Sequence, residues 1–193
     1  MHPEARDGLT RQLAASGLDL SARWRVLDLG GRDINGGIRD LLPNARWSGI
    51  DIAPGPGVDL VFDCTRPWPE TMTTFDLVVC TEVLEHVEKW ALILRTASQA
   101  LEPGGPELLF VTCASTGRPQ HGASGAPLPA PGEWYGNVAP AALADVLEGL
   151  FREAVVEFRP SPGDAYARAQ GVAARLRTTG AVAAVSAARN RKV

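Results

Sequence analysis

The residues best suited to chemistry in this sequence are acids that end apolar runs and lie close to glycines. Asp28 lies in a Val-Leu-Asp-Leu run followed by Gly30 and Gly31, and Asp51 and Asp63 end two later runs. In parallel α/β sheets the carboxyl ends of the strands meet at one edge and form the ligand crevice. The spacing therefore predicts that three carboxylates converge on one adenosine-containing ligand.

Two phosphate-binding interpretations of the glycine loop fit poorly. Gly31 and Gly36 have the spacing of a phosphate-cradling loop, but Gly37 and Ile38 replace its lysine and hydroxyl residues. A dinucleotide fingerprint needs glycine where Arg32 stands. A nicotinamide-dependent oxidoreductase is therefore a third-ranked hypothesis, which a titration with NADH would test.

S-adenosylmethionine fits the acids better, because it has no phosphate. Asp28 suits its charged amino group, Asp51 suits both ribose hydroxyls, and Asp63 suits the adenine amino group. Each acid also has a purely structural interpretation, since Asp28 could cap a helix and Asp51 and Asp63 could form surface turns.

Alternating elements must position these acids. The patterns predict helices over 3–16, 35–42, 83–101 and 140–150, and strands over 24–29, 46–50, 58–62, 75–80, 107–112, 154–158 and 165–173. The near-continuous apolar run at 75–80 is typical of a strand covered on both faces. We therefore expect an α/β sandwich around a parallel sheet, with the cofactor crevice above strands 24–29 and 75–80.

In this order of motifs the chain resembles the class I S-adenosylmethionine-dependent methyltransferases. The matching segments are residues 26–30 (VLDLG), 49–51 (GID), 62–64 (FDC), 75–87 (FDLVVCTEVLEHV) and 101–105 (LEPGG). The resemblance is good over residues 24–113 and holds in outline over 139–173. It implies a Rossmann-like, seven-stranded, mostly parallel sheet sandwiched by helices, with the last strand antiparallel.

The resemblance also implies cofactor-binding residues. Asp28, Gly30 and Gly31 correspond to the loop beneath the methionine part of the cofactor. This loop departs from the family pattern, because Arg32 and Ile34 replace its later glycines. The departure motivates an alternative function, that of a non-catalytic methyltransferase-like binding or assembly module.

The adenosine end has its own expected contacts. Asp51 corresponds to the ribose acid, and Ile52 is expected to pack on adenine. Asp63 and the backbone of Cys64 correspond to contacts with the adenine edge.

The segment after strand 75–80 supplies the residues nearest to the chemistry. Thr81 and Glu82 are expected to face the sulfonium, whereas Glu85 suits a solvated or capping role at a helix start. His86 and His121 are the candidate catalytic bases. Each histidine also has a structural alternative, since His86 could hold the loop after the strand and His121 could be a solvent residue.

The methyl acceptor is predicted less directly. Residues 114–137 are rich in Gly and Pro, lack periodicity, and form a candidate lid over the site. Trp134 and Tyr135 could stack on a substrate or pin this lid. The sequence after strand 75–80 lacks the Asp/Asn-Pro-Pro-Tyr/Phe run of DNA amino-methyltransferases and the Pro-Cys nucleophile of cytosine-C5 enzymes. We therefore expect a small-molecule acceptor.

Composition and charge limit the other possibilities. With 45% hydrophobic and 21% charged residues, we expect one methyltransferase-like domain over 1–174 and a basic, Ala-rich extension over 175–193. From position 165 onward six basic residues and no acid occur, so the extension could have an anionic partner, although the net charge of −3 argues against nucleic acid. No signal or membrane segment is evident, and the three cysteines match no zinc spacing. We expect a cytoplasmic protein with reduced thiols and no metal site.

Overall fold

A computed structural model describes residues 2–34 and 36–173, and the predicted extension over 175–193 lies outside them. In this part of the chain seven strands form one sheet in the order β3-β2-β1-β4-β5-β7-β6. The first five of these are parallel, and β7 is antiparallel to both β5 and β6. The predicted α/β fold, with its mostly parallel sheet and antiparallel last strand, is confirmed.

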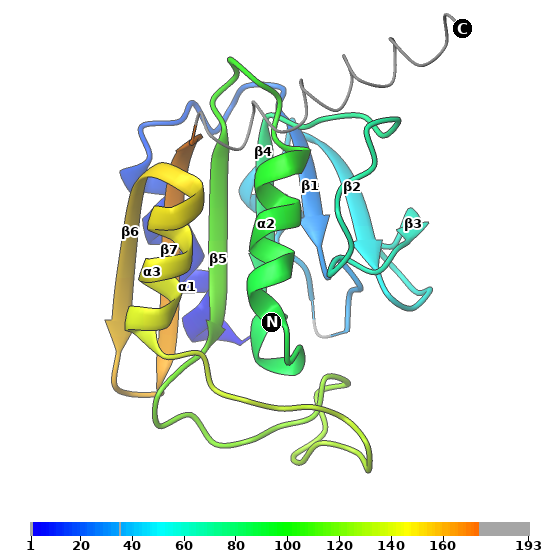
Figure 1. Cartoon of the computed structure of the whole chain (residues 1–193), viewed down its shortest axis with the longest axis vertical. Coiled ribbons are helices and arrows are strands. Elements are labelled where there is room, and N and C mark those ends of the chain that lie inside the picture. The colour runs from blue at the N-terminus through cyan, green and yellow to red at the C-terminus, as the bar shows by residue number, and fades with distance from the viewer. Residues whose placement is uncertain (1, 35, 174–193) are drawn as a thin grey trace, which may run out of the picture.

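The strands follow the predicted apolar runs with small shifts at their ends. Their bounds are β1 (Arg25–Leu29), β2 (Arg46–Asp51), β3 (Leu60–Val61), β4 (Leu77–Thr81), β5 (Leu108–Ala114), β6 (Phe151–Arg159) and β7 (Asp164–Val172). In Figure 1 the arrows of β1, β2 and β5 point toward the lower edge of the sheet, and β4 runs parallel to both β1 and β5. The acids at these strand ends therefore share one edge, as the sequence predicts.

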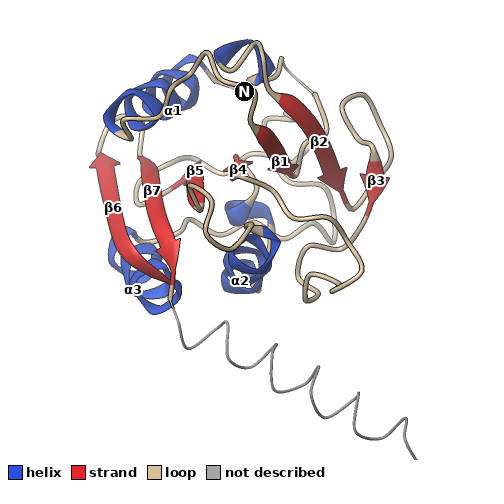
Figure 2. Ribbon diagram, turned by 90° about the horizontal axis from the view of Figure 1, so that it is seen from above, coloured by secondary structure: helices blue, strands red, loops and turns tan. Residues whose placement is uncertain are grey.

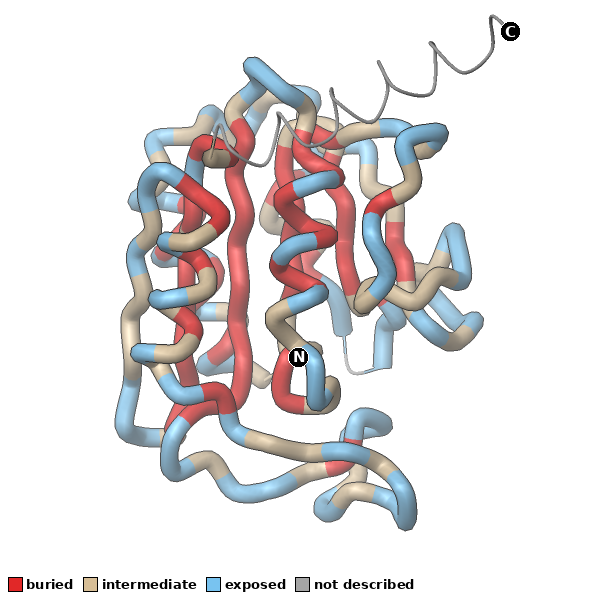
Figure 3. The backbone as a smooth tube through the Cα atoms, in the orientation of Figure 1, coloured by how far each residue is buried: buried red, intermediate tan, exposed pale blue. Residues whose placement is uncertain are grey.

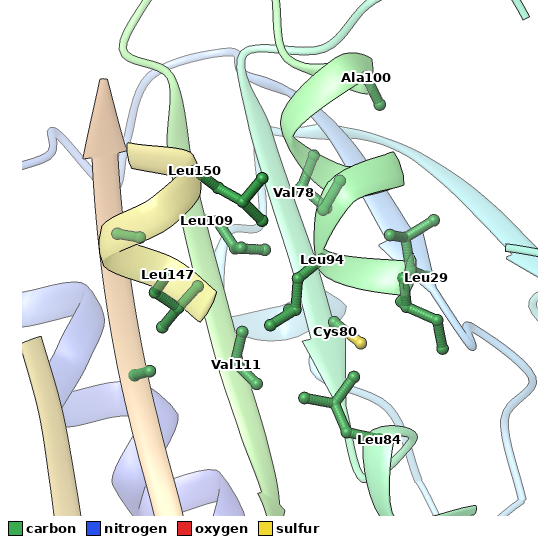
Figure 4. Packing of buried hydrophobic residues seen from close by; sticks show 14 of the residues in the cluster. Leu29, Val78, Cys80, Leu84, Leu94, Ala100, Leu109, Val111, Leu147 and Leu150 are labelled. Atoms are coloured by element: carbon green, nitrogen blue, oxygen red, sulfur yellow. The ribbon is translucent and has the colours of Figure 1, made fainter. Parts of the chain in front are cut away.

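Helices cover both faces of the sheet. Figure 2 shows α1 (Pro3–Ala15) on one face, and α2 (Trp90–Ala100) and α3 (Pro140–Leu150) on the other. Each face has its own hydrophobic cluster. The larger cluster lies beneath α2 and α3, where Leu94 and Leu147 pack toward the sheet (Figure 4). Burial is continuous along β4 and β5 in Figure 3, which explains their unbroken apolar sequences.

Two predicted helices are wrong in extent. The described residues of 35–42 contain only the 3₁₀ turn η1 (Arg39–Leu41). Gly36 and Gly37 disfavour an α-helix here, since glycine costs about 1 kcal/mol relative to alanine in a helix.

The predicted helix over 83–101 is divided. It begins as the 3₁₀ turn η2 (Leu84–His86) and becomes α-helical only from Trp90. The Glu85 carbonyl accepts a hydrogen bond from the Gly136 N–H at 2.8 Å rather than from a following helical residue. A long-range contact thus interrupts the helix.

Residues 114–137 form an ordered loop at the carboxyl edge of the sheet (Figure 1). Its two ends meet where the Val138 N–H donates to the Ala114 carbonyl at 3.0 Å. The Arg118 guanidinium donates to the buried Asp164 carboxylate at 3.0 Å. The loop is therefore anchored to β5 and β7.

No helix within residues 2–34 or 36–173 has the length and apolar character that crossing a membrane requires.

Candidate functional site

A cavity of about 820 Å³ opens at the carboxyl edge of β1, β2 and β4. It lies where the strand order reverses between β1 and β4, which is the usual ligand position in such sheets. Nine predicted site residues line it: Asp28, Gly30, Gly31, Asp51, Ile52, Thr81, Glu82, His86 and His121. The fold thus gathers residues from four chain segments around one cavity.

The glycine pair forms the turn that leaves β1. The N–H groups of Gly30 and Gly31 donate to the Ile50 carbonyl at 2.8 and 3.0 Å, which ties this turn to β2. Gly30 has a φ of 75°, and a β-carbon there would lie 2.1 Å from Cγ2 of Val83. This position therefore requires glycine both for its backbone conformation and for its packing.

Asp28 is the buried acid of the cavity, with 7% of its surface exposed. Burial raises its pKa to about 6, the charges of Asp51 and Asp33 add to this rise, and the Arg39 guanidinium opposes it. A buried carboxylate of this kind gains from a cationic ligand group, which restores the interactions lost with water.

Asp51 and Ile52 form the outer wall at the end of β2. The Asp51 carboxylate accepts the Ala53 N–H at 2.9 Å through Oδ1. Ile52 exposes 74% of its surface although it is apolar. An exposed apolar side chain beside an acid suits a ligand that carries a flat ring next to hydroxyl groups.

Glu82 lies at the inner end of the cavity, directly after β4. Its φ of 57° is in the left-handed region, and its Oε1 accepts the Thr112 hydroxyl at 2.9 Å. Burial raises the pKa of Glu82 to about 7. Its Oε2 is buried and has no hydrogen-bond partner in the described part of the chain.

Three aromatic rings meet beside Glu82. The ring centroids of His86 and His121 are 5.1 Å apart, and each also lies within 5.5 Å of the Tyr135 ring. Burial lowers the pKa of His86 to about 4, with a further contribution from His121. His86 is therefore neutral at pH 7 and has a lone pair available. Tyr135 is half-buried and its hydroxyl donates to the Pro119 carbonyl of the same loop at 3.2 Å, whereas Trp134 is 47% exposed.

Two predicted cofactor residues, Asp63 and Cys64, are absent from the cavity lining. The Asp63 carboxylate accepts the backbone N–H and the hydroxyl of Thr65 at 2.9 and 2.6 Å, so it forms a local turn. Burial raises the pKa of the Cys64 thiol to about 12, so the thiol stays protonated at neutral pH. Contact of these residues with an adenine edge stays a prediction.

Sequence reasoning missed further residues of the lining, among them His2 and Arg39. His2 immediately precedes α1, and Arg39 lies in η1 and donates to the Gly57 carbonyl at 2.7 Å. Neither residue lies at a strand end, and the prediction relied on strand ends. Arg39 could have been found only as a cation able to balance the three acids.

Comparison with known proteins adds a family assignment to this geometry. The sequence profile of a methyltransferase-domain family matches residues 1–148. No curated protein matches the chain by sequence.

Several solved structures share the fold at low sequence identity. DhpI in complex with S-adenosylhomocysteine superposes with a TM-score of 0.61 at 20% identity, over 87% of this chain and 85% of that one. The N-methyltransferase NodS from Bradyrhizobium japonicum, also bound to S-adenosylhomocysteine, has a TM-score of 0.55 at 19% identity, over 87% and 86% of the two chains.

A third structure contains a small substrate as well. The 1,6-didemethyltoxoflavin-N1-methyltransferase of Burkholderia thailandensis, with bound 1,6-didemethyltoxoflavin and S-adenosylhomocysteine, has a TM-score of 0.58 at 15% identity. The superposition covers 89% of this chain and 78% of the Burkholderia chain. At these identities the structures establish a common fold, and the sequence profile extends over most of the chain. Because the profile covers most of the chain, the chain belongs to this methyltransferase-domain family, and its fold is that of the class I S-adenosylmethionine-dependent methyltransferases.

Proposed function

We propose that this chain binds S-adenosylmethionine in the cavity at the carboxyl edge of β1, β2 and β4 and transfers its methyl group to a small-molecule acceptor. The observation that carries the proposal is that Asp28 and Asp51 line one cavity over the β1–β4 reversal. Three fold neighbours that bind S-adenosylhomocysteine support the choice of cofactor.

The residues around the cavity fit the parts of this cofactor. Asp28 is buried and gains from the positive amino group of the methionine part, and Asp51 at the rim can accept ribose hydroxyls. The exposed Ile52 side chain offers an apolar surface for adenine. These three residues therefore match, in turn, the charged amino group, the ribose and the adenine of the cofactor.

When bound, S-adenosylmethionine supplies a methyl group on a sulfonium, which an acceptor takes by in-line displacement. The task of the protein is then to hold the acceptor close and to exclude water. The loop over 114–137 can do both, because its residues His121, Gly122 and Ala123 form one wall of the cavity. His86, neutral at pH 7, is the residue best placed to take a proton from the acceptor.

Cavity size supports a small acceptor. A volume of about 820 Å³ lies within the range of roughly 300–1,000 Å³ that small-molecule sites occupy. One fold neighbour holds 1,6-didemethyltoxoflavin together with S-adenosylhomocysteine, which supports a small acceptor here.

The cellular location that we propose is the cytoplasm. Cys64, Cys80 and Cys113 are free thiols, which fits its reducing environment.

Calorimetry with S-adenosylhomocysteine tests this proposal. We expect one site per chain, and we expect Asp51→Ala to weaken binding at least about tenfold, since hydrogen bonds to a charged group contribute about 1.5–3 kcal/mol. Asp59→Ala is the matched control. It removes another acid from the same region, Asp59 does not line the cavity, and its carboxylate accepts the Gly49 N–H.

The result also separates the enzyme from the alternative module. Folded protein that shows no binding of S-adenosylhomocysteine would contradict the proposal and favour a non-catalytic, methyltransferase-like module. Equal losses in Asp51→Ala and Asp59→Ala would indicate that the binding site lies elsewhere.

A further inference from the structure

Three side chains with metal-ligating atoms meet at the edge of the cavity. Glu85 and His86 come from η2, and His121 comes from the loop over 114–137. One carboxylate oxygen and one nitrogen from each imidazole all lie within 4.8 Å of one another. The chain folds back over more than thirty residues to bring the third ligand to the first two.

Two of these residues have buried polar atoms without partners. Oε2 of Glu85 and Nδ1 of His86 are inaccessible to solvent and make no hydrogen bond to any described residue. Each unsatisfied buried group costs about 1–3 kcal/mol. A cation between the two atoms would satisfy both, since it accepts a lone pair from each.

The surroundings of the cluster hold its members in place. Oε1 of Glu85 accepts the Ala114 N–H at 3.0 Å, which leaves Oε2 as its available oxygen. Nδ1 of His121 lies 3.3 Å from the Pro119 carbonyl, and the Tyr135 hydroxyl donates to the same carbonyl at 3.2 Å. A proton held on Nδ1 would leave the Nε2 lone pair of His121 available. Backbone partners of this kind are typical of groups that orient metal ligands.

We propose that Glu85, His86 and His121 bind one divalent transition-metal ion, with Zn²⁺ or Mn²⁺ as the representative ions. Two imidazoles and one carboxylate form a ligand set typical of catalytic metal sites that keep open positions. Ligand atoms about 2.1 Å from one tetrahedral ion stand roughly 3.4 Å apart. The three atoms lie at most 4.8 Å apart, so binding requires them to draw together by up to roughly 1.4 Å, and rotation of the His121 side chain can contribute to this.

The proposed ion would face the cavity, because His86 and His121 both line it next to Glu82. An acceptor hydroxyl bound to such an ion would release its proton to water near neutral pH, and His86 would then act as a metal ligand rather than as the base named above. This consequence for catalysis rests on the proposed function, whereas metal binding itself does not. The proposal also departs from the expectation of no metal site, which depended on the spacing of the cysteines.

The test uses the untagged full chain after chelator treatment. Calorimetry with Zn²⁺ and with Mn²⁺ measures stoichiometry and affinity, and visible absorption of the Co²⁺-loaded protein reports the ligand set. We expect one ion per chain. His86→Ala and His121→Ala should each weaken binding at least about 100-fold, since loss of outer partners alone costs about 10- to 100-fold.

Glu88→Gln is the matched control. Glu88 is an exposed acid two residues after His86, and it belongs neither to the cluster nor to the cavity lining. His121→Ala changes a loop residue, so circular dichroism should show an unchanged fold. Sub-stoichiometric binding, or equal affinity in the wild type and in both ligand variants, would overturn the proposal. Binding of S-adenosylhomocysteine by the metal-free chain tests the proposed function separately.

Discussion

Gly30 and Val83 lie so close together that a β-carbon on Gly30 would stand 2.1 Å from Cγ2 of Val83. This contact joins the turn after β1 to the segment that follows β4, and both segments line the cavity. The shape of the cavity floor thus depends on the absence of one side chain.

We predict that Gly30→Ala destabilises the protein by about 2–4 kcal/mol, since it adds backbone strain at a φ of 75° to a steric clash. Gly104→Ala is the control, because Gly104 has a φ of 82° but a β-carbon there would have no atom of a neighbouring segment within 4 Å. Urea unfolding measures both variants. Equal losses in both would show that the contact with Val83 contributes nothing.

A second prediction concerns the anchor of the loop over 114–137. Asp164 is fully buried, and its carboxylate has the Arg118 guanidinium at 3.0 Å and the Tyr166 hydroxyl at 3.2 Å. Arg118→Ala would leave this carboxylate without its cation and should cost about 3–5 kcal/mol. Urea unfolding gives the loss, and hydrogen exchange should show faster opening of the loop. The control is Arg95→Ala, at an exposed position of α2, which should change stability by less than about 0.5 kcal/mol. An equal loss of stability in both variants would contradict the role of Arg118 as the anchor of the loop.

The sheet could be predicted from the sequence because each strand carries a local signal. The runs that end at Cys80 and Ala114 are buried on both faces, and their nearly continuous apolar composition predicts this burial. The break between η2 and α2 has no such signal. It depends on Glu85, whose backbone and side chain both bond to distant residues, Gly136 and Ala114.

The same contrast between local signals and long-range contacts explains which residues of the candidate site could be predicted. Asp28 and Asp51 lie at the ends of strands with clear apolar patterns, so their convergence could be predicted from the order of the strands. Asp63 follows a strand of only two residues, and its carboxylate turns back to Thr65. The meeting of His86 with His121 depends on the return path of a long loop, which periodicity cannot predict.

The raised pKa of Asp28 predicts how stability depends on pH. In the folded protein the Asp28 carboxyl has a pKa of about 6, above the ordinary value of 3.8. The folded state therefore binds the carboxyl proton more tightly than the unfolded state does. Stability therefore falls as the pH rises from about 4 to 7, by up to ~3 kcal/mol from this group. Asp28→Asn should lose this part of the dependence in urea unfolding measured across that range. Parallel curves for the variant and the wild type would contradict the prediction.

Ligand binding should show the opposite trend with pH, because the amino group of S-adenosylhomocysteine is a cation that prefers ionised Asp28. In wild-type protein we expect affinity to rise about tenfold between pH 5 and pH 7, as the fraction of ionised Asp28 grows. The other charges near Asp28, on Asp33, Arg39 and Asp51, are common to the wild type and the variant. The difference between calorimetric titrations of wild type and Asp28→Asn therefore isolates this carboxylate. An equal rise in both proteins would mean that the amino group binds elsewhere, and the methionine end of the cofactor would then have to be placed differently in the cavity.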